Sequence, residues 1–116
     1  MKSVEELEVF RLAHQLVLRI YQVTKRFPRE EVFGLSAQLR RAAASVPANL
    51  AEGAGRLSRR EYRQFVGVAK GSAAESSYHL LLAQDLGYVG SEEYHQLREQ
   101  YDRVGKMLTR LSQALS

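Results

Sequence analysis

Apolar residues recur at steps of three and four along most of the chain, which is the spacing of one face of an α-helix. The first such stretch has two adjacent apolar rows, which are Leu7, Phe10, Ala13, Val17, Ile20, Thr24 and Phe27, and then Val9, Leu12, Leu16 and Val23. Ser3 and Glu6 have the spacing of a capping box, and Pro28 disfavours a helical residue before it. A helix is therefore predicted from Ser3 to about Phe27.

The second stretch has a single apolar seam, formed by Leu35, Leu39, Ala42, Val46 and Leu50. The segment before it, residues 28–34, is predicted to form a helical lead-in turn. Pro47 lies inside the stretch and removes one backbone donor, so we expect a bend there rather than the end of the helix. Gly53 and Gly55 are predicted to turn the chain out of this helix.

Two more helices follow. Ser58 and Glu61 form a second capping-box pair, which begins a helix that should continue to about Leu86, and Gly87 and Gly90 mark the next turn. The seams of the two helices are Tyr62, Phe65, Val66, Ala69, Ala73, Ser76, Leu80 and Ala83, and then Tyr94, Leu97, Tyr101, Val104, Leu108, Leu111 and Leu115. Short connections favour antiparallel neighbours, so the predicted fold is all-α: one domain over residues 1–116, an up-down-up-down four-helix bundle.

Two apolar or small-residue surfaces exceed what one bundle needs. The apolar sector of the first helix covers about 180°, wider than the stripe of an ordinary surface helix. The third helix has small residues and a tyrosine on the side away from its seam, and glycine is costly in a helix. We therefore predict a homo-oligomer whose interface includes Val9, Leu12, Leu16, Gly67, Gly71, Ala74 and Tyr78. The alternative is that the glycines are tolerated on a solvated face.

The composition is that of a folded domain, with 45% hydrophobic and 26% charged residues. No apolar run approaches the ~20 residues of a membrane span, and the segment MKSVEELEVF lacks the apolar core of a signal peptide. Cysteine is absent, which excludes thiolate chemistry and fits a cytoplasmic protein. A net charge of +4 and a pI near 9.6 permit contact with nucleic acid without requiring it.

A polar row flanks the seam of the second helix. Its members Gln38, Arg41, Ser45, Asn49, Glu52 and Arg56 share one face, and they are predicted to form a buried structural network with Ser72 and Glu75. The alternative is a catalytic carboxylate pair, Glu52 and Glu75. No nucleophile, metal-ligand set or substrate pocket accompanies that pair in the sequence, so no catalytic residue is assigned and a non-enzymatic protein is expected.

Metal and cofactor sites are also not expected. A ferritin-like di-iron site needs two Glu-x-x-His motifs and two further glutamates. Only Glu92 and His95 have that spacing, and both should project towards solvent, while His14 and His79 have no partner at ligand spacing. The glycines at 53 and 55 do not match a phosphate-binding loop.

The segment RLSRREYR, residues 56–63, places Arg56, Arg59, Arg60 and Arg63 around the start of the third helix. Cations oppose the helix dipole at that end, so the pattern indicates a nucleic-acid-binding surface with phosphate as the ligand group. The alternative is that these arginines neutralise Glu52, Glu61 and the carbonyl end of the second helix. A second basic row, Arg103, Lys106 and Arg110, is interpreted as a solvated face.

The motif FPREEVFGLSAQLRRAAASVPANLAEGAGR, followed by S-x-x-EY and AKGSAAES, resembles the four-helix-bundle proteins encoded by intervening sequences of 23S ribosomal RNA genes. The accessory variability proteins of diversity-generating retroelements are similar to that group. The matching positions are Phe27, Pro28, Glu31, Phe33, Gly34, Leu35, Asn49, Ala51, Glu52 and Gly53, and later Gly71, Ser72 and Glu75. Leu50 departs from the isoleucine that is common in the family.

The resemblance implies a left-handed up-down bundle that assembles into a ring-like homopentamer. In the retroelement relatives the ring is basic and binds nucleic acid and a reverse transcriptase. The predicted function is thus a non-enzymatic oligomeric bundle that binds RNA or DNA through a basic surface. The alternative is a protein-only scaffold or accessory subunit, for example one that recruits a reverse transcriptase without contacting nucleic acid.

Overall fold

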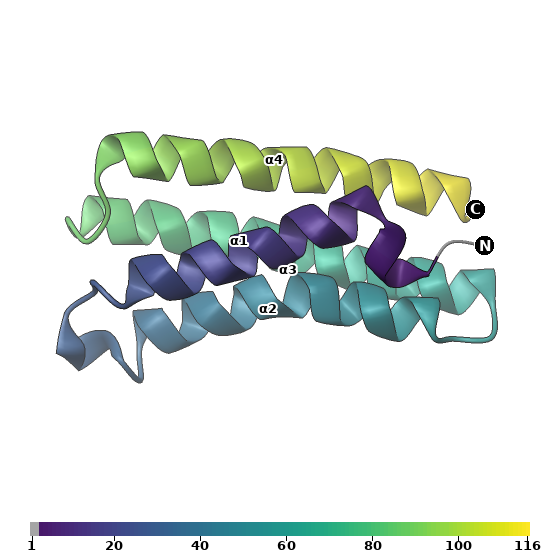
Figure 1. The fold of residues 1–116 in the computed structure, drawn as a ribbon, viewed down its shortest axis with the longest axis horizontal. Helices are drawn as coiled ribbons and strands as arrows, with labels where there is room; N and C mark the ends of the chain where they lie inside the picture. Colours follow the sequence, from purple (N-terminus) through teal and green to yellow (C-terminus); the bar gives the residue numbers. More distant parts are fainter. Residues whose placement is uncertain (1–2) are drawn as a thin grey trace.

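Four α-helices form almost all of the computed structural model, which describes residues 3–116. They are α1 (Glu8–Thr24), α2 (Leu35–Ala54), α3 (Arg59–Asp85) and α4 (Ser91–Ala114), and the 3-10 turns η1 (Val4–Glu6) and η2 (Arg29–Glu31) precede α1 and α2. Consecutive helices run in opposite directions and lie side by side (Figure 1). Each helix packs on the next, and α1 also packs on α4. The predicted antiparallel four-helix bundle is confirmed.

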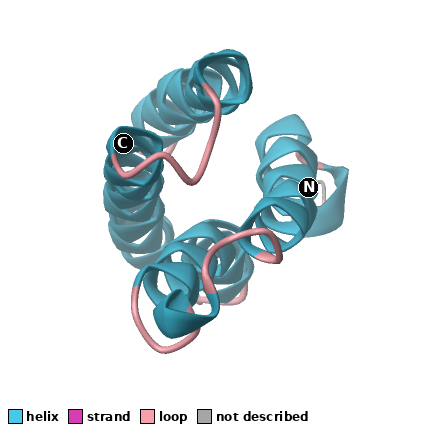
Figure 2. Ribbon diagram, turned by 90° about the vertical axis from the view of Figure 1, so that its left-hand side faces the viewer, coloured by secondary structure: helices cyan, strands magenta, loops and turns pink. Residues whose placement is uncertain are grey.

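The core lies along the axis that the four helices surround in the end-on view of Figure 2. Every residue of the predicted α2 seam is buried, and so are the first five residues of the α4 seam, while Leu111 and Leu115 are half-buried. The largest fully buried side chains come from all four helices and are Leu16, Ile20, Leu39, Leu50, Leu80, Leu97 and Leu108. Helical periodicity therefore identified the interior correctly.

The start of the first helix differs from the prediction. Leu7 has extended backbone (φ −70°, ψ 130°), so the helix breaks there and α1 begins at Glu8 instead of Ser3. The Ser3 hydroxyl donates to the Glu6 carboxylate at 3.3 Å, but neither side chain caps the backbone of η1. At the other end α1 stops at Thr24, and Phe27 packs into the core from the connection.

The wide apolar sector of α1 is used within the subunit. Val9 and Leu16 are 5% and 1% exposed and belong to the core, and Leu12 is half-buried against it. A helix that packs on both α2 and α4 needs a wider apolar sector than one with a single neighbour. The prediction that Val9 and Leu16 form a subunit interface is therefore wrong.

The end of α2 also needs a correction. The helix continues through Pro47 to Ala54, as expected, but Gly53 is a buried residue inside it rather than part of the exit turn. A Cβ atom at Gly53 would lie 2.8 Å from Cβ of Phe65, so this glycine permits the close approach of α3. Gly55 is the C-cap, and its amide donates to the carbonyls of Ala51 and Glu52.

The connections flanking α3 follow the prediction. The Ser58 hydroxyl accepts a hydrogen bond from the Glu61 amide at 3.1 Å, so the N-cap half of this capping box is confirmed, while the Glu61 carboxylate accepts from the Ser58 hydroxyl at 3.2 Å and not from the Ser58 amide. After α3, Gly87 adopts the left-handed conformation with φ +83° and reverses the chain. The C-terminal end of α4 therefore returns to the end of the bundle where α3 begins (Figure 1).

Candidate nucleic-acid interface

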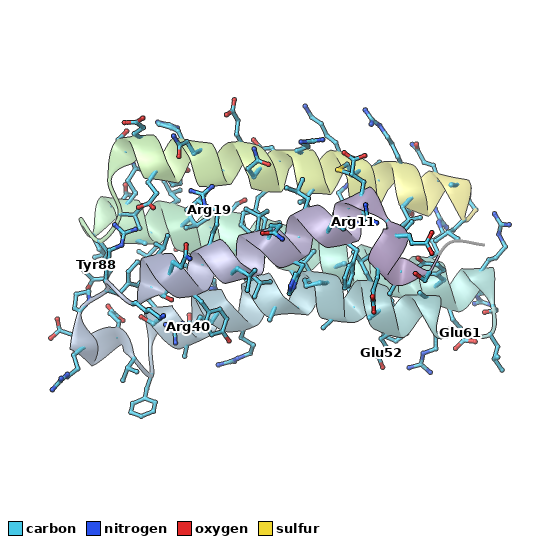
Figure 3. The ribbon with its side chains drawn as sticks, viewed as in Figure 1. Arg11, Arg19, Arg40, Glu52, Glu61 and Tyr88 are labelled. Atoms are coloured by element: carbon cyan, nitrogen blue, oxygen red, sulfur yellow. The ribbon has the colours of Figure 1, made fainter. Side chains whose placement is uncertain are left out.

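The predicted arginine cluster lies where α2 ends and α3 begins. Figure 3 shows Glu52 and Glu61 at this end of the bundle. Arg56 pairs with Glu52 at 3.1 Å, lies 4.0 Å from Glu61, and places its guanidinium 4.8 Å from the centre of the Phe65 ring. For Arg56 the alternative interpretation is therefore confirmed, because its charge is neutralised by these two acids.

Arg59 and Arg63 extend across to the last turn of α4. Arg59 donates to the carbonyl of Ala114, and Nε of Arg63 donates to the Ser112 hydroxyl at 3.2 Å. The unpaired carbonyls at the C-terminal end of a helix attract cations, which offsets the unfavourable position of these arginines at the start of α3. The carbonyl end that they approach belongs to α4, not to α2 as predicted.

The charges of three of the four arginines are not compensated by carboxylates. Arg59 and Arg63 bond to neutral groups only, and Arg60 has neither a hydrogen bond nor an ion pair within residues 3–116. All three are exposed. A guanidinium carries five donors, so Arg59 and Arg63 keep most of theirs available for phosphate oxygens.

A groove between α3 and α4 lies further along the pair of helices that the bond from Arg63 to Ser112 joins. Its volume is about 620 Å³, and it is lined by the cations Lys70, Arg98 and Lys106, by the acid Asp102, and otherwise mostly by small and apolar side chains. Nη1 of Arg98 donates to the Tyr94 hydroxyl at 2.6 Å, and this hydrogen bond raises the pKa of Arg98. Lys106, for which the sequence indicates only a solvated face, thus lies on the wall of a groove.

Tyr101 lines the same groove from α4 and is 2% exposed. Its hydroxyl has no hydrogen-bond partner of good geometry within residues 3–116, although Ser76, whose own hydroxyl donates to the Ser72 carbonyl at 2.9 Å, lies close to the phenol. Burial raises the pKa of Tyr101 far above its ordinary value of 10.0, and the nearness of Ser76 offsets part of this rise. The phenol is therefore neutral at every physiological pH.

The predicted polar network forms only in part. The Ser45 and Ser72 hydroxyls lie 2.8 Å apart, and Nδ2 of Asn49 donates to the carbonyl and the hydroxyl of Ser45 at 2.7 and 2.8 Å. These three residues join α2 to α3. Gln38 and Arg41 instead lie exposed around a hollow of about 140 Å³ that Glu75 also lines.

Glu52 and Glu75 lie outside that network. The Glu52 side chain is 56% exposed and pairs with Arg56, while the Glu75 side chain is 58% exposed and lies 3.1 Å from Nε2 of His79. The prediction that both carboxylates are buried is wrong, because the row flanking a seam lies at the edge of the interface. Each acid has its own partner, and no hydrogen bond joins the two.

Glu31 has a structural role that the sequence reasoning missed. One of its carboxylate oxygens accepts a hydrogen bond from the Leu35 amide at 3.0 Å and caps α2, and the other accepts one from the Tyr88 hydroxyl at 2.9 Å. This second bond raises the pKa of Tyr88, which Figure 3 shows beside the connection between α1 and α2. A Cβ atom at Gly34 would lie 2.7 Å from Glu31 Oε1, so glycine at this position leaves room for the carboxylate. The Glu-x-x-Gly-Leu spacing is therefore the sequence signal that could have indicated this cap.

Two other classes of site have no candidate residues in the described part of the chain. Within residues 3–116 no three His, Asp or Glu side chains are grouped as metal ligands. No helix over the same range is long and apolar enough to cross a membrane. Phe33 belongs to the motif that carries the family resemblance, but its side chain is 94% exposed and is not part of the core.

Comparison with known proteins identifies the family. The model of the 23S rRNA-intervening sequence protein family matches residues 5–110. The chain belongs to this family. A crystal structure of a protein of unknown function from the S23 ribosomal protein family of Bacteroides thetaiotaomicron is similar in fold, with a TM-score of 0.83, 24% identity, and coverage of 90% of this chain and 97% of that one. No curated protein shows significant similarity to the chain.

Proposed function

We propose that this member of the 23S rRNA-intervening sequence protein family is a non-enzymatic, homo-oligomeric bundle that binds RNA or DNA through a basic surface. The observation that carries the proposal is the uncompensated charge of Arg59, Arg60 and Arg63 in the first turns of α3, of which Arg59 and Arg63 bond to the last turn of α4. Exposed guanidinium groups with free donors suit the phosphate backbone, and such contacts confer affinity without sequence preference.

Assembly would strengthen this binding. The resemblance to the retroelement accessory proteins implies a pentameric ring, which would repeat the +4 charge of one chain five times around one axis. Linked copies of a weak site bind with increased avidity. Of the predicted interface, Gly67, Gly71, Ala74 and Tyr78 are all exposed on α3. Ala74 and Tyr78 line the groove, whereas Gly67 and Gly71 lie outside it and remain available for a subunit contact.

A protein partner is the second candidate. Phe33 and Leu57 are 94% and 102% exposed at opposite ends of the bundle, and either side chain would be removed from water by contact with a protein partner. A scaffold of this kind would recruit its partner without contacting nucleic acid.

The decisive experiment is the double charge reversal Arg59→Glu/Arg60→Glu. We expect it to abolish binding of labelled RNA and DNA, measured by fluorescence anisotropy at low salt, while the helical content is retained because acids suit a helix N-terminus. The matched control is Lys25→Glu/Arg29→Glu, two exposed reversals at the other end of the bundle. The slope of the logarithm of the binding constant against the logarithm of the salt concentration is the salt slope. In single variants, each arginine that no longer contacts a phosphate should lower its magnitude by about 0.7–0.9.

Two results would contradict the proposal. Absence of binding by the unmodified protein at tens of micromolar, with assembly intact, would favour the scaffold. A monomer mass by light scattering at micromolar concentration would refute the oligomer. If assembly uses the outer face of α3, replacing Gly71 with leucine should weaken it more than a change at the exposed residue Gln113.

A further inference from the structure

We propose that the groove between α3 and α4 binds a single strand of RNA or DNA, with its phosphates on the basic rim and a base against Tyr78. This inference rests on the proposed function and specifies the ligand class and its path. The groove is distinct from the arginine surface predicted from the sequence and lies further along the same pair of helices, which the bond from Arg63 to Ser112 joins.

The shape of the groove follows from small side chains on both walls. Ala73, Ala74 and Ser77 on α3 face Gly105 on α4, and a Cβ atom at Gly105 would meet nothing within 4 Å. The hollow of about 620 Å³ is therefore a consequence of the sequence at the helix contact. Its lining is largely apolar, which suits the face of an unstacked base better than a hydrated duplex backbone.

Positive charge follows both walls. On α3, Lys70 is two helical turns beyond Arg63 and shares its face, about 10 Å further along the axis. On α4, which runs antiparallel, Lys106 and Arg98 line the same groove, and Asp102 is the one acid among the lining residues. One cation on α3 and two on α4, spread along the groove, can follow a phosphate backbone, whereas a compact anion would need them to converge at one point.

Tyr78 supplies the surface that a base would meet. It forms the outer edge of the groove and is 58% exposed, which leaves its ring open to stacking. Tyr101 packs beneath the groove and is only 2% exposed, so it supports the floor and offers no ring face to a base.

The test compares a labelled single-stranded RNA of mixed sequence with a duplex of the same sequence. We expect Tyr78→Ala to weaken single-strand binding about tenfold and to leave duplex binding unchanged, because a duplex offers no free base for stacking. The salt slope should not change with Tyr78→Ala, whereas Lys70→Glu should reduce it. Tyr21→Ala and Lys25→Glu, at exposed positions around the end of α1, are the matched controls and should bind like the unmodified protein.

The outcomes separate this inference from the function on which it rests. If single strands bind and the Arg59→Glu/Arg60→Glu protein loses them, but Tyr78→Ala and Lys70→Glu do not, the groove proposal is overturned and the proposed function stands. If Tyr78→Ala instead lowers the oligomer mass, the groove edge is a subunit contact and the proposal is wrong. Failure of the unmodified protein to bind any RNA or DNA overturns both. Binding of an acidic helical peptide in place of RNA would assign the groove to a protein partner.

Discussion

Replacement of Tyr101 by phenylalanine should stabilise the protein. The residue is 2% exposed and its hydroxyl has no hydrogen-bond partner within residues 3–116. A buried hydroxyl left unpaired costs roughly 1–3 kcal/mol relative to a solvated one. Phenylalanine keeps the ring and removes only the oxygen, whose void of about 15 Å³ costs about 0.4 kcal/mol. The expected net gain in the free energy of unfolding is therefore about 1 kcal/mol.

Thermal unfolding followed by circular dichroism measures this gain at a fixed protein concentration, because assembly makes Tm concentration-dependent. For a chain of this size a gain of about 1 kcal/mol corresponds to a rise in Tm of about 3–5 °C. Tyr94→Phe is the matched control, since its hydroxyl accepts a hydrogen bond from Arg98 at 2.6 Å. That variant should lose about 0.5–1.5 kcal/mol. If both variants lose stability equally, the Tyr101 hydroxyl has a partner and the prediction is wrong.

The pH dependence gives an independent check. The pKa of Tyr101 is raised in the folded state above its ordinary value of 10.0 by burial. Its contribution to stability is therefore full below pH 10.0 and is lost as the pH rises, because the unfolded chain ionises there and the folded chain does not. Tyr101→Phe should make the alkaline loss of stability shallower. An unchanged alkaline limb would show that the phenol ionises as easily in the folded protein.

Two other changes test the packing and the surface charges. Gly53→Ala should lower the free energy of unfolding by about 1–3 kcal/mol, because the new Cβ would lie 2.8 Å from Phe65 Cβ. Gly67→Ala, whose Cβ would meet nothing within 4 Å, should raise it by up to about 1 kcal/mol through helix propensity. Equal effects would show that α3 can shift. Glu52→Ala should cost only about 0.3–0.5 kcal/mol, the value of an exposed pair with Arg56; a loss above about 1 kcal/mol would mean that Glu52 is buried in the assembled protein.

The helices and their buried faces were predictable because both depend on local periodicity. The α2 seam is buried throughout, and the N-cap hydrogen bond at Ser58 forms as the spacing of Ser58 and Glu61 indicated. The same local reasoning failed at Ser3, where Leu7 adopts extended backbone and the helix begins later. A capping pair shows that a turn can begin there, but it does not show that the turn continues as an α-helix.

The errors at the candidate site share a physical cause, which is that they depend on which helices become neighbours. The apolar face of α1 is wide because α1 packs on both α2 and α4 within the subunit, and Val9 and Leu16 are therefore in the core. The partner of Arg59 lies 55 residues away on α4, and Tyr88 lies 57 residues from Glu31. No short-range pattern indicates such contacts. The contact between Arg59 and α4 could have been inferred only from the antiparallel order of the helices, because that order places the start of α3 and the end of α4 at the same end of the bundle.

The motif that identifies the family has mainly structural contacts in this chain. Glu31 caps α2 and holds Tyr88, Asn49 joins Ser45, and Gly53 admits α3. These contacts explain why the motif predicts the fold well and the activity poorly. Among the features on which binding is proposed, Arg59 and Arg60 occupy the unspecified positions of S-x-x-EY, and the groove residues Tyr78, Arg98 and Lys106 lie outside the motif. Relatives that share the motif are therefore expected to share the bundle and to differ in what they bind, according to the charges and aromatic residues along the contact between α3 and α4.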